Sequence, residues 1–147
     1  MPYSDKKIEK FFKKAKLMCK ISDYPRNKVG AVIVHKGKIV SVGFNQQKSN
    51  PLQKEYNLCR IYDNRFYDVD KGENNIHAET SAILSAQKLN IDLSECSIFV
   101  YRQKKSGCQG LSKPCKACQQ LLKDNGIKDW YYTLDDGWRY ERKDIGT

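Results

Sequence analysis

The residues best suited to metal chemistry lie in two short segments, His77-Ala78-Glu79 and Pro114-Cys115-Lys116-Ala117-Cys118. One imidazole and two thiols are ligands that zinc prefers. A structural zinc site closes its coordination with four protein ligands, whereas a catalytic site leaves one position for water and needs a nearby base. Glu79 is a carboxylate beside the ligands that can act as this base. The pattern therefore predicts a catalytic Zn²⁺ bound by His77, Cys115 and Cys118.

Each segment alone has a less specific interpretation. A histidine among apolar neighbours on a helix is more often a buried structural residue, and a lone CxxC is often a redox motif or half of a zinc finger. A closed structural zinc site that recruits Cys59 or Cys108 as its fourth ligand is the alternative for the whole set. The combination of three ligands with Glu79 favours the catalytic site.

Two helices are expected to carry the metal ligands, one over residues 76–88 and one over residues 115–124. Crossovers between parallel strands are right-handed, which places both helices on the same face of a sheet with their N-termini together. Cys115 and Cys118 then share one helix face, where the positive end of the helix dipole favours thiolate over thiol. Pro114 fixes the backbone angle φ just before this helix, where its missing amide hydrogen costs nothing.

Runs of β-branched and aromatic residues predict the sheet that supports these helices. Strands are expected at 29–34, 39–44, 97–101, 130–134 and 138–142, after a first helix that Ser4 caps. The last two strands must be antiparallel, because a parallel return needs a crossover of a dozen or more residues. The expected fold class is α/β, with helices on both faces of a five-stranded mixed sheet and an antiparallel C-terminal hairpin. Residues 45–75 are polar and irregular, which indicates a functional or mobile loop.

The composition is that of one soluble domain. A chain of 147 residues can bury a core without disulfides, so a single domain over residues 1–147 is expected. The sequence reaches Lys6 and Lys7 without an apolar stretch, and no later run approaches the length of a membrane span. The six cysteines do not follow a secreted pattern and are interpreted as reduced thiols. We expect a cytoplasmic protein with no membrane partner.

The net charge of +10 is concentrated in two regions. Residues 1–30 carry nine Lys/Arg against three acids, and residues 101–128 carry seven against one. A basic surface attracts anions, either nucleotide phosphates or a polynucleotide backbone. The alternative is a solvated lysine face that only keeps the protein soluble, because lysines at helical spacing usually lie on the surface.

On the two metal motifs, the chain resembles the cytidine and deoxycytidylate deaminase superfamily of zinc-dependent nucleobase deaminases. The resemblance extends from Val29-Gly30-Ala31-Val32 and Gly43-Phe44-Asn45 to Gly126-Ile127-Lys128. It implies a three-layer α/β/α cytidine deaminase-like fold and a homo-oligomer. It also implies that Glu79 shuttles protons between water, the ring nitrogen and departing ammonia. The family's substrate contacts would fall on four residues: Asn45, Ala78, Lys113 and Pro114.

The histidine in the first ligand position, and the strand that begins at Lys28, resemble the deoxycytidylate branch of the superfamily. The chain departs from that branch after Asn45, where Gln46-Gln47-Lys48 replaces a glycine-rich segment. The favoured function is hydrolytic deamination of a free cytosine nucleotide or nucleoside, dCMP to dUMP first. Three cations of the 45–75 segment are candidates to bind its phosphate: Lys48, Lys54 and Arg60.

Two other functions stay open at this point. A cytosine or adenine deaminase acting on single-stranded DNA or RNA would need an open groove, and four lysines could follow the strand: Lys104, Lys105, Lys113 and Lys116. A zinc-stabilised nucleic-acid-binding module without activity belongs to another class, and the presence of Glu79 argues against it.

Overall fold

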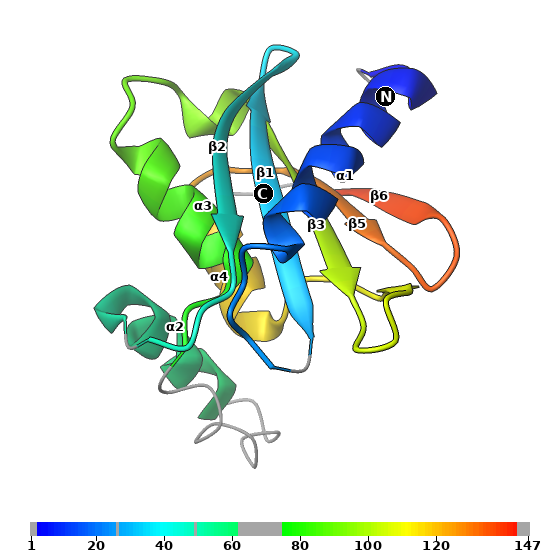
Figure 1. Cartoon of the computed structure of the whole chain (residues 1–147). Helices are drawn as coiled ribbons and strands as arrows, with labels where there is room; N and C mark the ends of the chain where they lie inside the picture. Colours follow the sequence, from blue (N-terminus) through cyan, green and yellow to red (C-terminus); the bar gives the residue numbers. More distant parts are fainter. Residues whose placement is uncertain (1–2, 26, 49, 62–74, 144–147) are drawn as a thin grey trace.

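A computed structural model of the chain describes residues 3–25, 27–48, 50–61 and 75–143, with only the backbone of residues 58–61 (Figure 1). Its centre is a mixed sheet in the order β2-β1-β3-β5-β6. The five strands are β1 (Lys28–His35), β2 (Lys38–Phe44), β3 (Cys96–Gln103), β5 (Asp129–Thr133) and β6 (Trp138–Arg142). A two-residue strand, β4 (Gln109–Gly110), pairs with β3 outside this path. The expected five-stranded mixed sheet is confirmed.

The pairing directions agree with the sequence prediction. β3 and β5 are parallel, and the other pairs are antiparallel. The last hairpin has the register Thr133↔Trp138 to Asp129↔Arg142. Gly137 lies in its turn with a φ of 82°, a conformation that glycine adopts without strain. The antiparallel C-terminal hairpin is therefore confirmed.

Helices cover both faces of the sheet, in three layers (Figure 1). On one face lies α1 (Asp5–Cys19), which begins where the Ser4 hydroxyl accepts a hydrogen bond from the Lys7 amide. Its apolar stripe, which includes Ile8 and Phe12, packs on Phe99 and Tyr131 of the sheet. The second face is covered by α3 (Ala78–Gln87) and α4 (Lys116–Asp124).

Gly43 allows α3 to approach β2 closely. A Cβ atom at this position would lie 2.4 Å from both the Ala78 carbonyl oxygen and the Ala82 amide nitrogen. Two residues earlier on the same strand face, the Ser41 hydroxyl donates to the Ala82 carbonyl at 2.9 Å. The start of α3, which carries His77 and Glu79, is thus set against the sheet by a residue without a side chain.

The 45–75 segment differs from the prediction of an irregular loop, because it contains α2 (Pro51–Ile61). Asn50 caps this helix: its side-chain oxygen accepts from the Gln53 amide at 2.9 Å, and Pro51 takes the first helical position. Both are standard start signals, which the polar composition of the segment obscured. Residues 62–74 lie outside the described part, so the prediction of a functional or mobile loop is not tested there.

Two smaller elements also depart from the sequence prediction. β3 runs two residues beyond the expected end at Tyr101, and β4 returns along it within a segment for which no strand was predicted. A short 3-10 helix, η2 (Leu93–Glu95), precedes β3. In the described part of the chain, none of the helices has the length and apolar character needed to cross a bilayer.

Candidate active site

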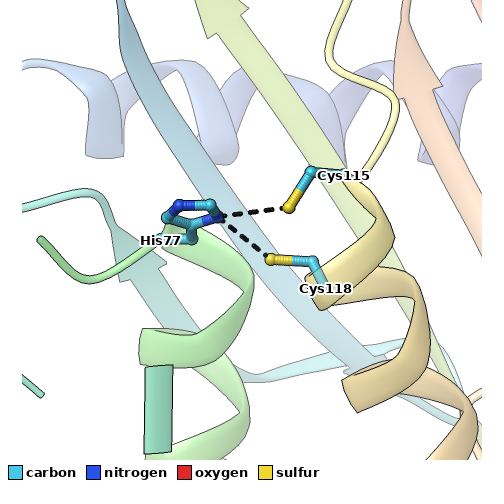
Figure 2. A group of neighbouring side chains, drawn as sticks. All are labelled: His77, Cys115 and Cys118. Atoms are coloured by element: carbon cyan, nitrogen blue, oxygen red, sulfur yellow. Dashed lines mark hydrogen bonds between the residues drawn. The ribbon is translucent and has the colours of Figure 1, made fainter. Parts of the chain in front are cut away.

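The three predicted metal ligands meet at the N-termini of α3 and α4 (Figure 2). His77 and Cys115 are the N-cap residues of the two helices, and Cys118 lies in the first turn of α4. The His77 Nδ1 atom is 3.3 Å from the Cys118 Sγ and 3.5 Å from the Cys115 Sγ. The prediction that one sheet face brings these helix ends together is confirmed by the geometry.

This donor set fits zinc. Bonds of about 2.0 to 2.3 Å in a tetrahedral site separate the ligand atoms by roughly 3.3 to 3.8 Å. The two distances from His77 fall within this interval, and all three ligand atoms lie within 4.8 Å of one another. Of the two alternative fourth ligands, Cys108 is exposed and outside the group, and the side chain of Cys59 is not among the described ones. The described residues thus bring three ligands together.

The two thiols are electrostatically unequal. A hydrogen bond with Cys118 is the main cause of the lowered pKa of Cys115, and the same bond, together with burial, raises the pKa of Cys118. Metal binding needs both sulfurs as thiolates and releases the protons they hold. The N-terminus of α4 contributes a partial positive charge that favours this state.

Glu79 lies in the first turn of α3, close to the metal ligands. Its side chain is buried, with 5% of its surface exposed, and burial raises its pKa to about 7. It lines a cavity of about 630 Å³ that His77 and Cys115 also line. A carboxyl with a pKa near neutrality can both accept and donate a proton. The position and environment of Glu79 therefore suit proton transfer.

Asn45 also lines the cavity, but most of its amide is engaged in the fold. Its Oδ1 accepts from the Val29 amide at 3.0 Å and from the Ser22 hydroxyl at 2.6 Å. Its Nδ2 donates to the Asn27 carbonyl at 2.8 Å, which leaves one amide hydrogen without a partner among the described residues. Asn45 thus bonds to Ser22, Asn27 and Val29, and among the described residues it has one donor left.

Of the other residues predicted to contact the substrate, some line the cavity and others do not. Ala78 and Lys113 line the cavity, whereas Pro114 is buried beside it and is not among the described lining residues. Lys48 and Lys54, which the sequence suggested for phosphate binding, are exposed and are not in the cavity wall either. The side chain of Arg60 lies outside the described part.

Sequence reasoning missed several residues of the cavity wall: Tyr24, Asn27, Asn75, Arg102, Leu111 and Ser112. Arg102 could have been found from the two-residue period of β3, because it follows Ile98 and Val100 on one strand face. The others lie in irregular segments, where no periodicity indicates which side chains converge.

Gln53 of α2 is a further residue that the sequence did not indicate. Its side chain is 1% exposed, and its Oε1 accepts from the His77 amide at 2.9 Å and from the Thr80 hydroxyl at 2.6 Å. Its Nε2 donates to the buried Asn57 at 3.0 Å. A neighbouring helix thus caps the start of α3, and the His77 imidazole makes no capping bond. The backbone that carries the first predicted metal ligand is fixed through Gln53.

Replacement of Gln53 by Met should lower the affinity for zinc by about 10- to 100-fold, the usual effect of losing a group that orients a metal ligand. The substitution keeps the side-chain length but leaves the His77 amide and the Thr80 hydroxyl without their acceptor. Competition with a chromophoric chelator measures the affinity, and circular dichroism checks the helix content. Gln87→Met, at the exposed end of α3, is the matched control. An unchanged zinc affinity in Gln53→Met would show that this cap does not position His77.

Comparison with known proteins agrees with this geometry. The family model described as the cytidine and deoxycytidylate deaminase zinc-binding region matches residues 5–134. A probable deoxycytidylate deaminase of Caenorhabditis elegans is 30% identical over 133 residues, which are 86% of this chain and 57% of that protein. An uncharacterized deaminase in the luxG 3' region of Aliivibrio fischeri is 32% identical over 127 residues, 84% of this chain and 69% of that protein.

A solved structure supports the fold. The apo dCMP deaminase of the cyanophage S-TIM5 has a TM-score of 0.62 at 22% identity, with 90% of this chain and 86% of that chain covered. The same cyanophage protein in complex with dCMP and dUMP has a TM-score of 0.60, also at 22% identity, over 88% and 82% of the two chains. The chain spans little more than half the length of the C. elegans relative. Because the family model matches most of its residues, the protein belongs to the cytidine and deoxycytidylate deaminase family with its zinc-binding region.

Proposed function

We propose that the protein catalyses zinc-dependent hydrolytic deamination of a free cytosine nucleotide, with dCMP as the preferred substrate and dUMP and ammonia as products. The observation that carries this proposal is the buried Glu79 carboxyl in the cavity wall, next to three converging metal ligands. A zinc site that served only to stabilise a fold would not need a buried carboxyl that costs desolvation energy.

The residues have distinct roles in this reaction. His77, Cys115 and Cys118 would hold zinc, which when bound supplies the Lewis acidity that makes water a nucleophile near neutral pH. Glu79 takes a proton from the water and delivers it to the ring nitrogen beside the amine. The carbon that bore the amine gains the water oxygen and loses nitrogen, which leaves as ammonia with a second proton carried by Glu79. Asn45 has one amide hydrogen for the sugar or base.

The names of related proteins support dCMP as the substrate. The C. elegans relative is named a probable deoxycytidylate deaminase, and the cyanophage deaminase binds dCMP and dUMP in its solved complex. The charge of residues 101–128 would instead suit a polynucleotide, but the structure shows part of that charge neutralised. The Lys104 Nζ lies 3.3 Å from the Asp135 Oδ1, and the Lys113 Nζ lies 3.5 Å from the Glu141 Oε2. In the described part of the chain, two of the four lysines suggested for a strand path thus have acidic partners.

Ammonia release from a panel of cytosine compounds tests the proposal. We expect the highest kcat/KM for dCMP, compared with CMP, deoxycytidine, cytidine and single-stranded oligonucleotides. If the protein binds one phosphate, its affinity for the substrate should fall only slightly as the salt concentration rises. Several phosphate contacts along a strand would make the affinity fall steeply. Faster deamination of oligonucleotides with a steep salt slope would assign the enzyme to polynucleotides. If no compound releases ammonia from the zinc-loaded protein, a binding module without activity takes the place of the deaminase.

A further inference from the structure

Arg102 lies near the end of β3, on the sheet face that α3 and α4 cover. It is the first residue on this face of β3 that follows the buried core. Ile98 and Val100, four and two residues earlier, are buried in the cluster beneath α3 and α4. Because side chains alternate along a strand, Arg102 lies on the same sheet face, and it lines the cavity with Glu79. Its backbone is paired on both sides, with Val29 of β1 and Gly110 of β4. A rigid element therefore carries this cation into the active site.

The guanidinium is fixed by neutral groups. Its Nη1 donates to the Leu111 carbonyl at 3.2 Å, and its Nη2 donates to the Asn27 side-chain oxygen at 2.9 Å. Among the described residues no carboxylate contacts Arg102, in contrast to Lys104 and Lys113, which both have one. Glu79 is the single acid among the described residues of the cavity wall. Within the part of the chain that the structure describes, the positive charge of Arg102 is therefore held in place without a counter-ion.

One buried donor of the same wall, the Arg102 Nε, has no partner among the described residues; the Asn75 Oδ1 is also unpaired there, but it is an acceptor and cannot bond to a phosphate oxygen. Buried polar groups are rarely unpaired in folded proteins, so such atoms call for an explanation. The Asn75 Nδ2 donates to the Tyr24 hydroxyl at 3.3 Å, and both residues line the cavity. A donor set of guanidinium, amide N–H and phenol O–H, in which the charge has no acidic partner among the described residues, suits a phosphate group.

We propose that Arg102, with Tyr24 and Asn75, forms the site that binds the phosphate of the substrate. This inference rests on the proposed function, because it places the phosphate in the cavity where Glu79 acts on the base. It assigns the preference for a nucleotide over a nucleoside to Arg102, and not to the cations of the 45–75 segment. The phosphate of a free mononucleotide and that of a strand share this chemistry.

The test compares kcat/KM for dCMP with that for deoxycytidine. In Arg102→Gln the ratio of the two should fall about 10- to 100-fold, because a charge-assisted hydrogen bond to phosphate is lost. Lys105→Gln is the matched control, since Lys105 is an exposed cation of the same hairpin outside the cavity wall, and there the ratio should be unchanged. If Arg102→Gln lowers kcat/KM more for single-stranded oligonucleotides than for dCMP, the phosphate that Arg102 binds is that of a strand.

Binding of the product gives a readout that does not depend on activity. Isothermal titration should show that Arg102→Gln weakens dUMP binding about 10- to 100-fold and removes most of its advantage over deoxyuridine. The role of Arg102 would be overturned if Arg102→Gln changed neither the ratio of kcat/KM between dCMP and deoxycytidine nor the ratio of affinities between dUMP and deoxyuridine. The deaminase proposal would then remain intact. If the wild-type protein releases no ammonia but Arg102→Gln still weakens dUMP binding, the proposed function fails and the phosphate site stands.

Discussion

Replacement of Glu79 by Gln should lower kcat for the deaminated substrate by a factor of about 10² to 10⁴, the usual contribution of a positioned proton carrier. The amide keeps the shape of the side chain but cannot exchange protons with water, ring nitrogen and ammonia. None of the metal ligands changes, so metal analysis should still find one zinc per chain. Ammonia release under saturating dCMP measures the loss.

Stability separates a catalytic role of Glu79 from a structural one. Burial raises the pKa of Glu79, which shows that its charged form is disfavoured at this position. A neutral amide avoids that desolvation cost, so thermal unfolding of Glu79→Gln should begin no lower than that of the wild type. Glu55→Gln, the same change at an exposed position of α2, should retain full activity. A fully active Glu79→Gln protein would refute the proton-carrier role.

The metal site was predictable because its constraints are local in the sequence. Two cysteines three residues apart share a helix face, a proline marks where that helix begins, and the helix dipole there favours thiolates. The meeting of His77 with the cysteines followed from one topological rule, the handedness of strand crossovers. The direction of the last strand pair was equally predictable. The Asp136-Gly137 turn and the few residues between β5 and β6 allow only an antiparallel pair.

The residues around the metal ligands were harder to predict. Gln53 and His77 are brought together by the packing of α2, and the start of that helix was hidden in a polar segment. Arg102 was missed because β3 was expected to end one residue before it. The alternation along β3 indicates the face of Arg102 once the strand is extended by one residue, whereas the contact between Gln53 and His77 depends on the packing of two helices, which no pattern within a single element indicates.

Replacement of Cys118 by Ser should abolish zinc binding and activity together and lower the midpoint of thermal unfolding by several degrees. Cys118 is 1% exposed and lies within 3.3 Å of the His77 imidazole, so its loss leaves two ligands. Two ligands cannot hold zinc at nanomolar concentrations of free metal, and the stabilisation that metal binding gives to the folded state is lost with it. Metal analysis after dialysis and calorimetry measure the two effects.

Other cysteines provide the controls for this experiment. Cys96 is equally buried, but its thiol bonds to the Asp92 carbonyl and burial raises its pKa to about 11, so Cys96→Ser should retain one zinc per chain. Cys108→Ser tests the closed structural site, in which Cys108 would be the fourth ligand. Retention of zinc and activity in both Cys108→Ser and Cys59→Ser, with loss of both in Cys118→Ser, would leave three protein ligands and an open position for water. Loss of zinc in Cys108→Ser would contradict the catalytic site, because a fourth protein ligand occupies the position that water needs.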